Sequence, residues 1–188
     1  MPPELVALLE AYAYEYGETY DAYLATEDDR QYFWMPGRRG VVAFVRWRGV
    51  VNVLGGLLAP PEAQEELLKL FLRFVELNGL TVNFFNIGRI QERLFRSAGC
   101  QVNKCTEELI VRLDRTSWQG KAYQWLRRQE NYCVRKRLRF EEIDPGADDK
   151  QYRKTIVPQL EAVNQEHLAG TVHGRELVFF EGRFDPWA

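Results

Sequence analysis

Two runs of β-branched residues separated by only two residues constrain the fold of this chain more than any other feature. The runs cover 40–47 (GVVAFVRW) and 50–54 (VVNVL). Such runs favour strands, and so short a connection joins antiparallel neighbours. A third strand is predicted over 31–35, because 36–40 (PGRRG) has the proline and glycine content of a second turn. The first half of the chain therefore predicts an antiparallel meander.

A helix and further alternating elements follow the meander. Residues 62–77 place apolar side chains on one helical face, and Asn78-Gly79 marks the end of that helix. The other elements expected are helices over 3–13, 18–25, 89–97, 118–136 and 152–169 and strands over 81–87, 102–113 and 140–143. A meander passing into an αβαβ tail is typical of the GNAT acyltransferase core, although an unrelated α+β domain could have the same order. We therefore expect an α+β fold with a mixed sheet flanked by helices.

Basic residues are concentrated in the segment 119–139, whereas the whole chain has a net charge of -2. The cations of this segment are Lys121, Arg127, Arg128, Arg135, Lys136, Arg137 and Arg139, and its acid is Glu130. Charge segregated in this way indicates an anionic partner.

A helix over this segment would align some of these cations into a ridge, at about 100° per residue. The ridge consists of Lys121, Arg128, Arg135 and, if the helix reaches that far, Arg139. Its aromatic edge is Trp125 and Tyr132, and its expected buried face is Ala122, Leu126 and Cys133. Cations beside aromatic rings suit a nucleic-acid phosphate backbone with unstacked bases nearby, as at the acceptor end of a tRNA, and also anionic lipid headgroups. The alternative is a solvated helix face whose cations pair with acids elsewhere in the fold.

Several classes of protein are disfavoured by composition. The sequence has no uncharged apolar run of about 18 residues that could span a bilayer, and its acidic N-terminal stretch differs from a signal peptide. Three cysteines without a CxxC pair indicate reduced thiols and a cytoplasmic location. His167 and His173 lack further ligands at metal spacing, so no metal site is expected.

Two motifs that could carry chemistry are better explained structurally. The strand-to-helix connection over 54–62 has two glycines but no Lys or Arg, and its prolines cannot donate hydrogen bonds. It therefore does not suit the pyrophosphate of coenzyme A, and no cofactor is expected. Glu107 and Glu108 would point to opposite faces of a strand, so they are not expected to share a proton.

The order of short motifs resembles the C-terminal, cytosolic domain of phosphatidylglycerol lysyltransferases. The matching pieces are Tyr16-Gly17, Tyr32-Phe33, GVVAFVRWRGVVNVLGG, APPEAQEELLKLFLRFVELNG, TVNFFNI, Leu94-Phe95, Ala98-Gly99, Lys104, Glu107-Glu108, Gly120-Lys121, Leu126-Arg127, Asn131 and EGRFDPW. Two departures are Gly55-Gly56-Leu57, where the family usually has Gly-Asp-Pro, and Thr106, where it usually has glycine.

The resemblance implies two GNAT-like halves joined by a basic helix. It places a first domain at 1–115, the bridging helix at 116–139 and the start of a second half at 140–188. The family transfers an aminoacyl group from tRNA to a lipid headgroup, and its second half carries the catalytic tunnel. Because the chain stops at Ala188, we expect it to be the non-catalytic first half of such an enzyme. The residues that catalyse the transfer cannot be named from this sequence. We also expect self-association through the incomplete second half.

The resemblance and the charge pattern together assign the tRNA- or anion-binding residues. These are Lys121, Arg127, Arg128, Arg135 and Arg139. The expected partners are aminoacyl-tRNA and anionic lipid headgroups. A second hypothesis is a catalytically inactive module that binds nucleic acid, anionic lipid or a protein, and a coenzyme A-dependent acetyltransferase is a third.

Overall fold

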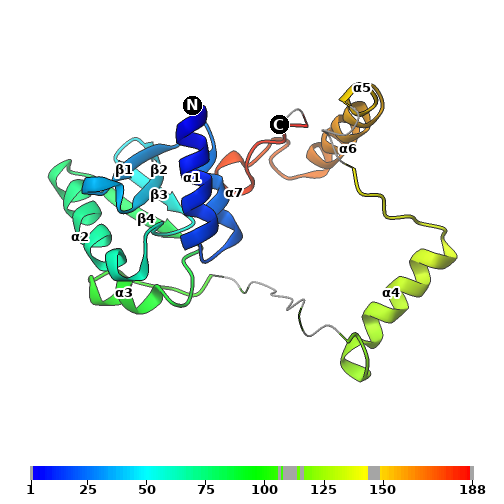
Figure 1. The fold of residues 1–188 in the computed structure, drawn as a ribbon, viewed down its shortest axis with the longest axis horizontal. Coiled ribbons are helices and arrows are strands. Elements are labelled where there is room, and N and C mark those ends of the chain that lie inside the picture. The colour runs from blue at the N-terminus through cyan, green and yellow to red at the C-terminus, as the bar shows by residue number, and fades with distance from the viewer. Residues whose placement is uncertain (1, 106, 108–113, 115–116, 144–148, 187–188) are drawn as a thin grey trace. The chain divides into compact units, whose positions relative to one another are not determined.

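The chain divides into two compact units in the computed structural model, which describes residues 2–105, 107, 114, 117–143 and 149–186 (Figure 1). Unit 1 comprises Met1–Cys105 and Ala162–Pro186, and unit 2 comprises Thr106–Glu161. The elements of unit 1, with 3₁₀ helices labelled η, are α1 (Pro3–Tyr16), η1 (Tyr20–Thr26), β1 (Gln31–Trp34), η2 (Pro36–Arg38), β2 (Val41–Trp47), β3 (Val50–Leu54), α2 (Pro61–Leu77), β4 (Thr81–Phe85), α3 (Glu92–Ser97) and α7 (Val178–Glu181).

The described strands form one mixed sheet with the order β1-β2-β3-β4. β1 pairs antiparallel with β2, and β2 with β3, whose turn is closed by the pair Trp47–Val50. β4 returns parallel to β3 after the crossover helix α2, with Val50 opposite Thr81. The predicted meander and the α+β class are therefore confirmed.

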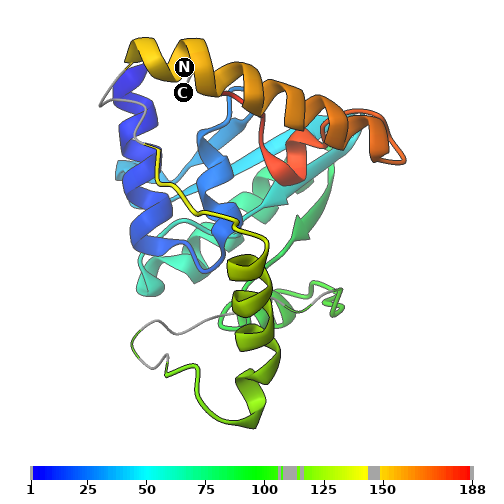
Figure 2. The ribbon, with the colours of Figure 1, turned by 90° about the vertical axis from the view of Figure 1, so that its right-hand side faces the viewer.

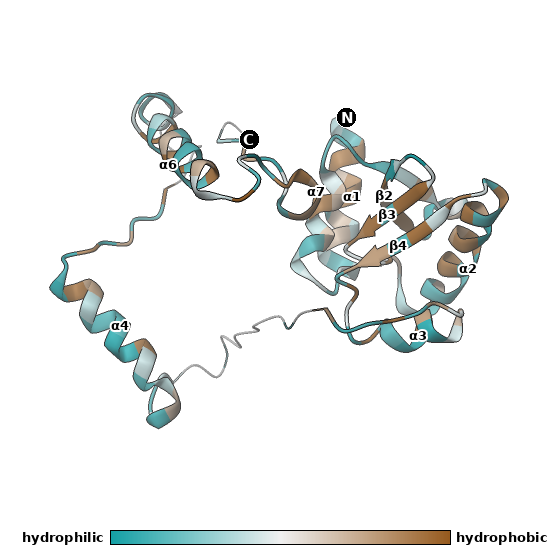
Figure 3. Cartoon of the chain, turned by 180° about the vertical axis from the view of Figure 1, so that it is seen from behind, coloured by the Kyte–Doolittle hydropathy of each residue, from teal (hydrophilic) through white to brown (hydrophobic). Residues whose placement is uncertain are grey.

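Side chains of the sheet alternate between two cores. Val42 and Phe44 face the core that contains α2, whereas Val41 and Ala43 face the core that contains α1. This period of two places the helices α1 and α2 on opposite sides of the sheet, as Figure 1 shows. The apolar colouring of the strands in Figure 3 marks the same sandwiched layer.

A group of aromatic rings fills the α2 core. Phe71 is fully buried, and its ring centroid lies 5.5 to 6.0 Å from those of four neighbours. These neighbours are Phe33, Phe44, Phe74 and Phe84. Burying a ring of this size stabilises a fold by about 1.5–3 kcal/mol, so Phe71 holds α2 against three of the strands.

The helices on either side of β4, α2 and α3, each end at a glycine with a left-handed backbone conformation. After α2, Gly79 has φ 62° and the Leu80 N–H donates to the Val75 carbonyl at 3.0 Å. After α3, Gly99 has φ 84° and the Cys100 N–H donates to the Phe95 carbonyl at 3.0 Å. Glycine adopts this backbone conformation without steric cost, so these ends follow directly from the sequence.

The short helix α7 returns to the first elements of unit 1 (Figure 2). The rings of Phe179 and Phe180 lie 5.7 and 5.4 Å from that of Phe85 at the end of β4. The Arg183 N–H donates to Glu27 Oε1 at 3.4 Å. Residues distant in sequence thus complete the unit.

The elements described in unit 2 are η4 (Lys121–Tyr123), α4 (Gln124–Arg135), α5 (Asp149–Gln151), the π-helical turn η5 (Tyr152–Ile156) and α6 (Val157–Gly170), which continues into unit 1. The helix predicted over 152–169 is confirmed, and η5 precedes Pro158 in the first turn of α6. This π turn accommodates the missing proline N–H.

Some sequence predictions were wrong. The helix predicted from Trp118 begins as a 3₁₀ turn at Lys121 and becomes an α-helix at Gln124. Residues 140–143 form no strand, and neither do 102–105. The rest of the strand predicted over 102–113 lies outside the described residues, except for Glu107. Within the described ranges, no helix is both long enough and apolar enough to cross a membrane.

Candidate functional site

The start of α4 is held by one of its own cations. Trp118 and Gly120 have φ of 48° and 84°, so the chain turns sharply before the helix. Arg127 folds back over this turn and donates to the Trp118 carbonyl at 2.7 Å and to the Gly120 carbonyl at 3.0 Å. Arg127, which the sequence suggested as an anion ligand, is therefore engaged in shaping the approach to the helix.

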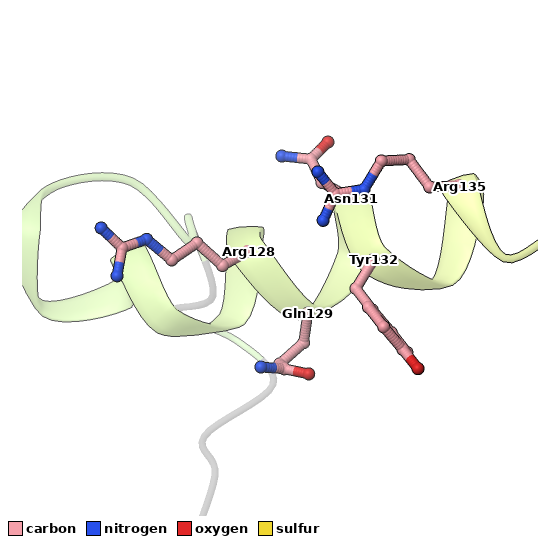
Figure 4. Close-up of a pocket in the computed structure, with 5 residues that line it drawn as sticks. All are labelled: Arg128, Gln129, Asn131, Tyr132 and Arg135. Carbon is pink, nitrogen blue, oxygen red and sulfur yellow. The ribbon is translucent and has the colours of Figure 1, made fainter.

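The next two arginines of α4 border an open hollow. Its lining residues are Arg128, Gln129, Asn131, Tyr132 and Arg135. Figure 4 shows Asn131 and Arg135 extending from one side of α4 and Gln129 and Tyr132 from the other, with Arg128 nearer the helix start. Arg128 and Arg135 are seven residues apart, which brings them to the same side of the helix. Two cations and two amides thus surround one concave surface.

Exposed rings accompany these arginines along the helix. The Trp125 and Tyr132 side chains are 65% and 47% exposed, and Lys136 Nζ lies 5.9 Å from the centre of the Tyr132 ring. Trp125, Arg128, Tyr132 and Arg135 follow one another at spacings of three, four and three residues, which places them on a single face of the helix. The arrangement offers planar rings for stacking beside charges for phosphates.

The arginines of this face are not neutralised by acids in the described part of the chain. The ion pairs between described residues join Arg30 to Asp29, Arg39 to Glu66, Lys69 to Glu65 and Arg96 to Glu92. All of them lie in unit 1. Within the described residues of unit 2, Arg128 and Arg135 form no ion pair.

Two of the predicted ridge residues lie outside α4. Lys121 belongs to the 3₁₀ turn η4, and Arg139 lies four residues beyond the end of the helix. The helix ends at Arg135 because Arg137 is left-handed, with φ 55°, and the Leu138 N–H donates to the Cys133 carbonyl at 3.0 Å. The structure therefore brings Arg128 and Arg135 together and leaves Arg139 off the ridge.

The expected buried face of α4 is not covered within unit 2. Ala122 and Leu126 are exposed, Leu126 at 38%, and Cys133 is partly exposed. None of the residues of α4 is buried. Its apolar side chains therefore contact no core within the described residues of unit 2.

The loop between β3 and α2 is occupied by a side chain that sequence reasoning missed. Gln91 is buried, accepts from the Leu57 N–H at 3.4 Å, and donates to the Leu57 carbonyl at 3.4 Å. The next amide, of Leu58, donates to the Val41 carbonyl at 3.1 Å. A pyrophosphate would need such amides free. The loop therefore does not fit coenzyme A, for reasons of hydrogen bonding as well as composition.

Buried polar groups gather beside this loop. Asn86 donates to Asp21 at 2.9 Å, and Asp21 is 1% exposed. Burial raises the pKa of the Glu18 carboxyl, an effect that hydrogen bonds from Gln91 and Ile90 partly offset. A single sequence gave no signal for this cluster, because its members come from separate parts of the chain. No three His, Cys, Asp or Glu side chains of the described residues could hold a metal together.

Comparison with solved structures supports the fold. The structure of L-PGS from Bacillus licheniformis is 27% identical, with a TM-score of 0.59 over 71% of this chain and 40% of that chain. The C-terminal domain of a putative lysylphosphatidylglycerol synthetase from Agrobacterium fabrum has a TM-score of 0.75 over 89% of this chain and 52% of that one. At 16% identity, the second likeness shows the fold alone. The GNAT-like mixed sheet expected from the sequence is confirmed.

Comparison with known sequences shows the family. A phosphatidylglycerol lysyltransferase of Staphylococcus epidermidis is 25% identical over 179 residues, which is 95% of this chain and 20% of the relative. One from Staphylococcus aureus is 28% identical over 131 residues, 70% of this chain and 16% of the relative. The chain thus spans about a fifth of the length of the curated relatives it matches. The family model described as phosphatidylglycerol lysyltransferase, C-terminal, matches residues 10–188. The chain therefore belongs to the phosphatidylglycerol lysyltransferase C-terminal family.

Proposed function

We propose that this chain takes part in transferring an aminoacyl group from tRNA to phosphatidylglycerol or a similar acceptor, and that it does so on the cytoplasmic side of the membrane. Its role is to hold the tRNA, while the acceptor hydroxyl attacks the aminoacyl ester at a site supplied by a second GNAT-like half. Family membership supports the reaction class. The three-part organisation into 1–115, 116–139 and 140–188 belongs to the same proposal.

The exposed pair Arg128 and Arg135 carries the proposal. Both arginines flank the hollow on α4, and neither is paired with an acid among the described residues. Guanidinium groups bind phosphate with two parallel hydrogen bonds. Trp125 and Tyr132 supply faces on which unpaired bases of an acceptor end could stack.

The other predicted cations have secondary roles in this proposal. Lys121 adds a charge at the start of the helix, and Arg139 adds one on the extended segment after it. Arg127 acts indirectly, because its guanidinium holds the turn at Trp118 and Gly120.

Filter binding of tRNA across a series of salt concentrations tests this role. Arg128→Gln with Arg135→Gln is expected to weaken binding and to reduce the slope of log affinity against log salt by roughly 1.4–1.8, since each phosphate contact contributes about 0.7–0.9. The matched control is Arg89→Gln with Arg93→Gln, which removes two exposed arginines from unit 1. Equal slopes for the two double variants would reject α4 as the tRNA site.

A transfer assay tests the division of labour. With lysyl-tRNA and vesicles containing phosphatidylglycerol, the 188-residue chain alone is expected to give no lysylated lipid. Turnover by this chain would show that the first half itself is catalytic. If the unchanged chain bound tRNA no better than the variant with Arg128→Gln and Arg135→Gln, the proposal would be replaced by its alternative, a catalytically inactive module that binds another partner.

A further inference from the structure

The helix α1 is apolar on two sides. Its buried residues, Leu9 and Ala13, pack against the sheet. Away from them, Ala7, Ala11 and Tyr14 are exposed, Tyr14 at 79%. At about 100° per residue these three fall within about 60° of one another, so they form one stripe, the α1 stripe. A helix that is apolar on every side is normally covered on every side, which marks the α1 stripe as a contact surface.

Acids border the α1 stripe on both sides. Glu10 lies beside Tyr14 on one side, and Glu4 and Glu15 lie on the other. None of these three acids forms an ion pair with another described residue. Tyr23 of η1 extends the surface, because its ring centroid lies 5.8 Å from that of Tyr14 and its hydroxyl donates to Glu10 Oε1 at 3.0 Å. The surface is therefore apolar along its centre and negative along its edges.

The charge of this region differs from that of the rest of the chain. The first 29 residues contain eight acids and no Lys or Arg, so the net charge of -2 leaves +6 on the remaining residues. Arg30 and Arg38 contact η1 and α1, but their guanidinium carbons lie 5.0 and 5.9 Å from the centres of the Phe179 and Trp34 rings. A partner for the α1 stripe is therefore expected to be positively charged.

The helix α4 carries the complementary pattern. Its exposed rings, Trp125 and Tyr132, fall within about 20° of each other around the helix. Arg128 and Arg135 border these rings on one side, and Lys136, at the end of the helix, borders them on the other. α4 thus has large rings where α1 has two alanines, and cations where α1 has acids.

We propose that the α1 stripe of one molecule binds α4 of a second copy of this chain. The rings of Trp125 and Tyr132 would pack over Ala7 and Ala11, whose small side chains let two helices approach closely. The charges along the edges would pair across the contact and set the orientation of the helices. Two molecules can make this contact twice, α1 of each with α4 of the other, which closes a dimer. The inference rests on the proposed function in one respect, since the face of α4 that it covers is the face proposed to hold tRNA.

A charge-swap experiment tests the pairing. One variant carries Glu10→Arg with Glu15→Arg, and the other carries Arg128→Glu with Arg135→Glu. Alone, each variant sets like charges against each other and is expected to self-associate at least about tenfold more weakly than the unchanged chain, because an exposed ion pair contributes up to about fivefold. An equimolar mixture restores opposite charges at both contacts and is expected to associate like the unchanged chain. Sedimentation velocity over a range of concentrations measures all four samples, and circular dichroism checks that the variants are folded.

The chain offers a matched control on other helices. Glu76 of α2 and Glu166 of α6 are exposed, so Glu76→Arg with Glu166→Arg changes the net charge as much as Glu10→Arg with Glu15→Arg does. This control is expected to associate like the unchanged chain, and an equal loss would overturn the inference. Monomers of the unchanged chain at the highest concentration would also overturn it. So would a mixture of the swapped variants that stayed monomeric, because no pairing between molecules would then exist.

Adding tRNA separates this inference from the proposed function. Because the second copy and tRNA would occupy the same face of α4, saturating tRNA is expected to dissociate the dimer. Dimers that persisted with tRNA bound to them would overturn the inference and leave the tRNA proposal intact. If the chain bound no tRNA, the proposed function would fail, and the charge-swap mixture would still decide whether α1 and α4 of two molecules pair.

Discussion

Arg30 and Phe179 are joined across 149 positions of sequence. Arg30 Nη2 donates to the Phe179 carbonyl at 3.0 Å, and its guanidinium carbon lies 5.0 Å from the centre of the Phe179 ring. Arg30 Nε donates to the Leu24 carbonyl at 3.0 Å. Burial lowers the pKa of Arg30, and the charges of Asp29 and Glu27 oppose that effect. One side chain therefore fastens η1, the start of β1 and α7 together.

Replacing Arg30 by Gln is expected to lower the free energy of unfolding by about 2–4 kcal/mol. A charged hydrogen bond contributes roughly 1.5–3 kcal/mol, and the carbonyl groups of Leu24 and Phe179 would lose their donor. Arg39→Gln is the matched control, because the Arg39–Glu66 pair is half exposed on both sides and is worth at most about 1 kcal/mol. Urea unfolding measures both. Similar midpoints for the two variants would contradict the role of Arg30.

Glu18 is expected to make stability depend on pH. Burial raises its pKa above the ordinary 4.5, so the folded state favours the protonated carboxyl. The contribution of the raised Glu18 pKa to the free energy of unfolding is therefore fully present below about pH 4.5. It is lost as the pH rises through the pKa of Glu18 in the folded state. The Gln side chain of Glu18→Gln cannot ionise, so the variant does not lose this stability as the pH rises. Urea unfolding at pH 4.5 and pH 7 should show the variant gaining stability relative to the unchanged chain at pH 7, and a constant difference would contradict this.

Arg127 and Arg128 are expected to differ although they are neighbours. Arg127→Gln removes the two hydrogen bonds that hold the turn before α4, so hydrogen exchange of the amides over 118–124 should accelerate. Arg128→Gln removes a side chain of the exposed face and should leave that exchange unchanged. Equal protection of this segment in the two variants would show that the turn does not depend on Arg127.

The strands and most helix ends could be predicted because their signals are local. The β-branched runs gave β2 and β3 to within one residue, and glycine marked the left-handed ends of α2 and α3. α4 ends at Arg135, one residue before the predicted end at Lys136, but the residue that ends it carries no such signal. Its left-handed position is occupied by Arg137, which carries no sequence signal for that conformation. Arg139 was expected on the ridge only if the helix reached it, and the left-handed Arg137 prevents that.

The polar interior could not be predicted because it depends on contacts between distant loops. The sequence places Gln91 at the start of a helix with no sign of a further role. In the structure its side chain accepts a hydrogen bond from the Leu57 N–H and donates one to the Leu57 carbonyl. The ridge pair Arg128 and Arg135 was predictable from helical spacing alone. The role of Arg127 was not, since the carbonyl groups it binds precede the helix. The expected self-association stays a prediction.

The position of unit 2 within the chain has a consequence for proteolysis. The polypeptide leaves unit 1 after Cys105 and rejoins it at Ala162, and α7 then packs against η1 and β4. A protease that cleaved once between these points would produce two fragments without separating them, because the later fragment still carries the Phe179 and Arg183 contacts. The nicked protein should elute as a single species under native conditions and as two only after denaturation.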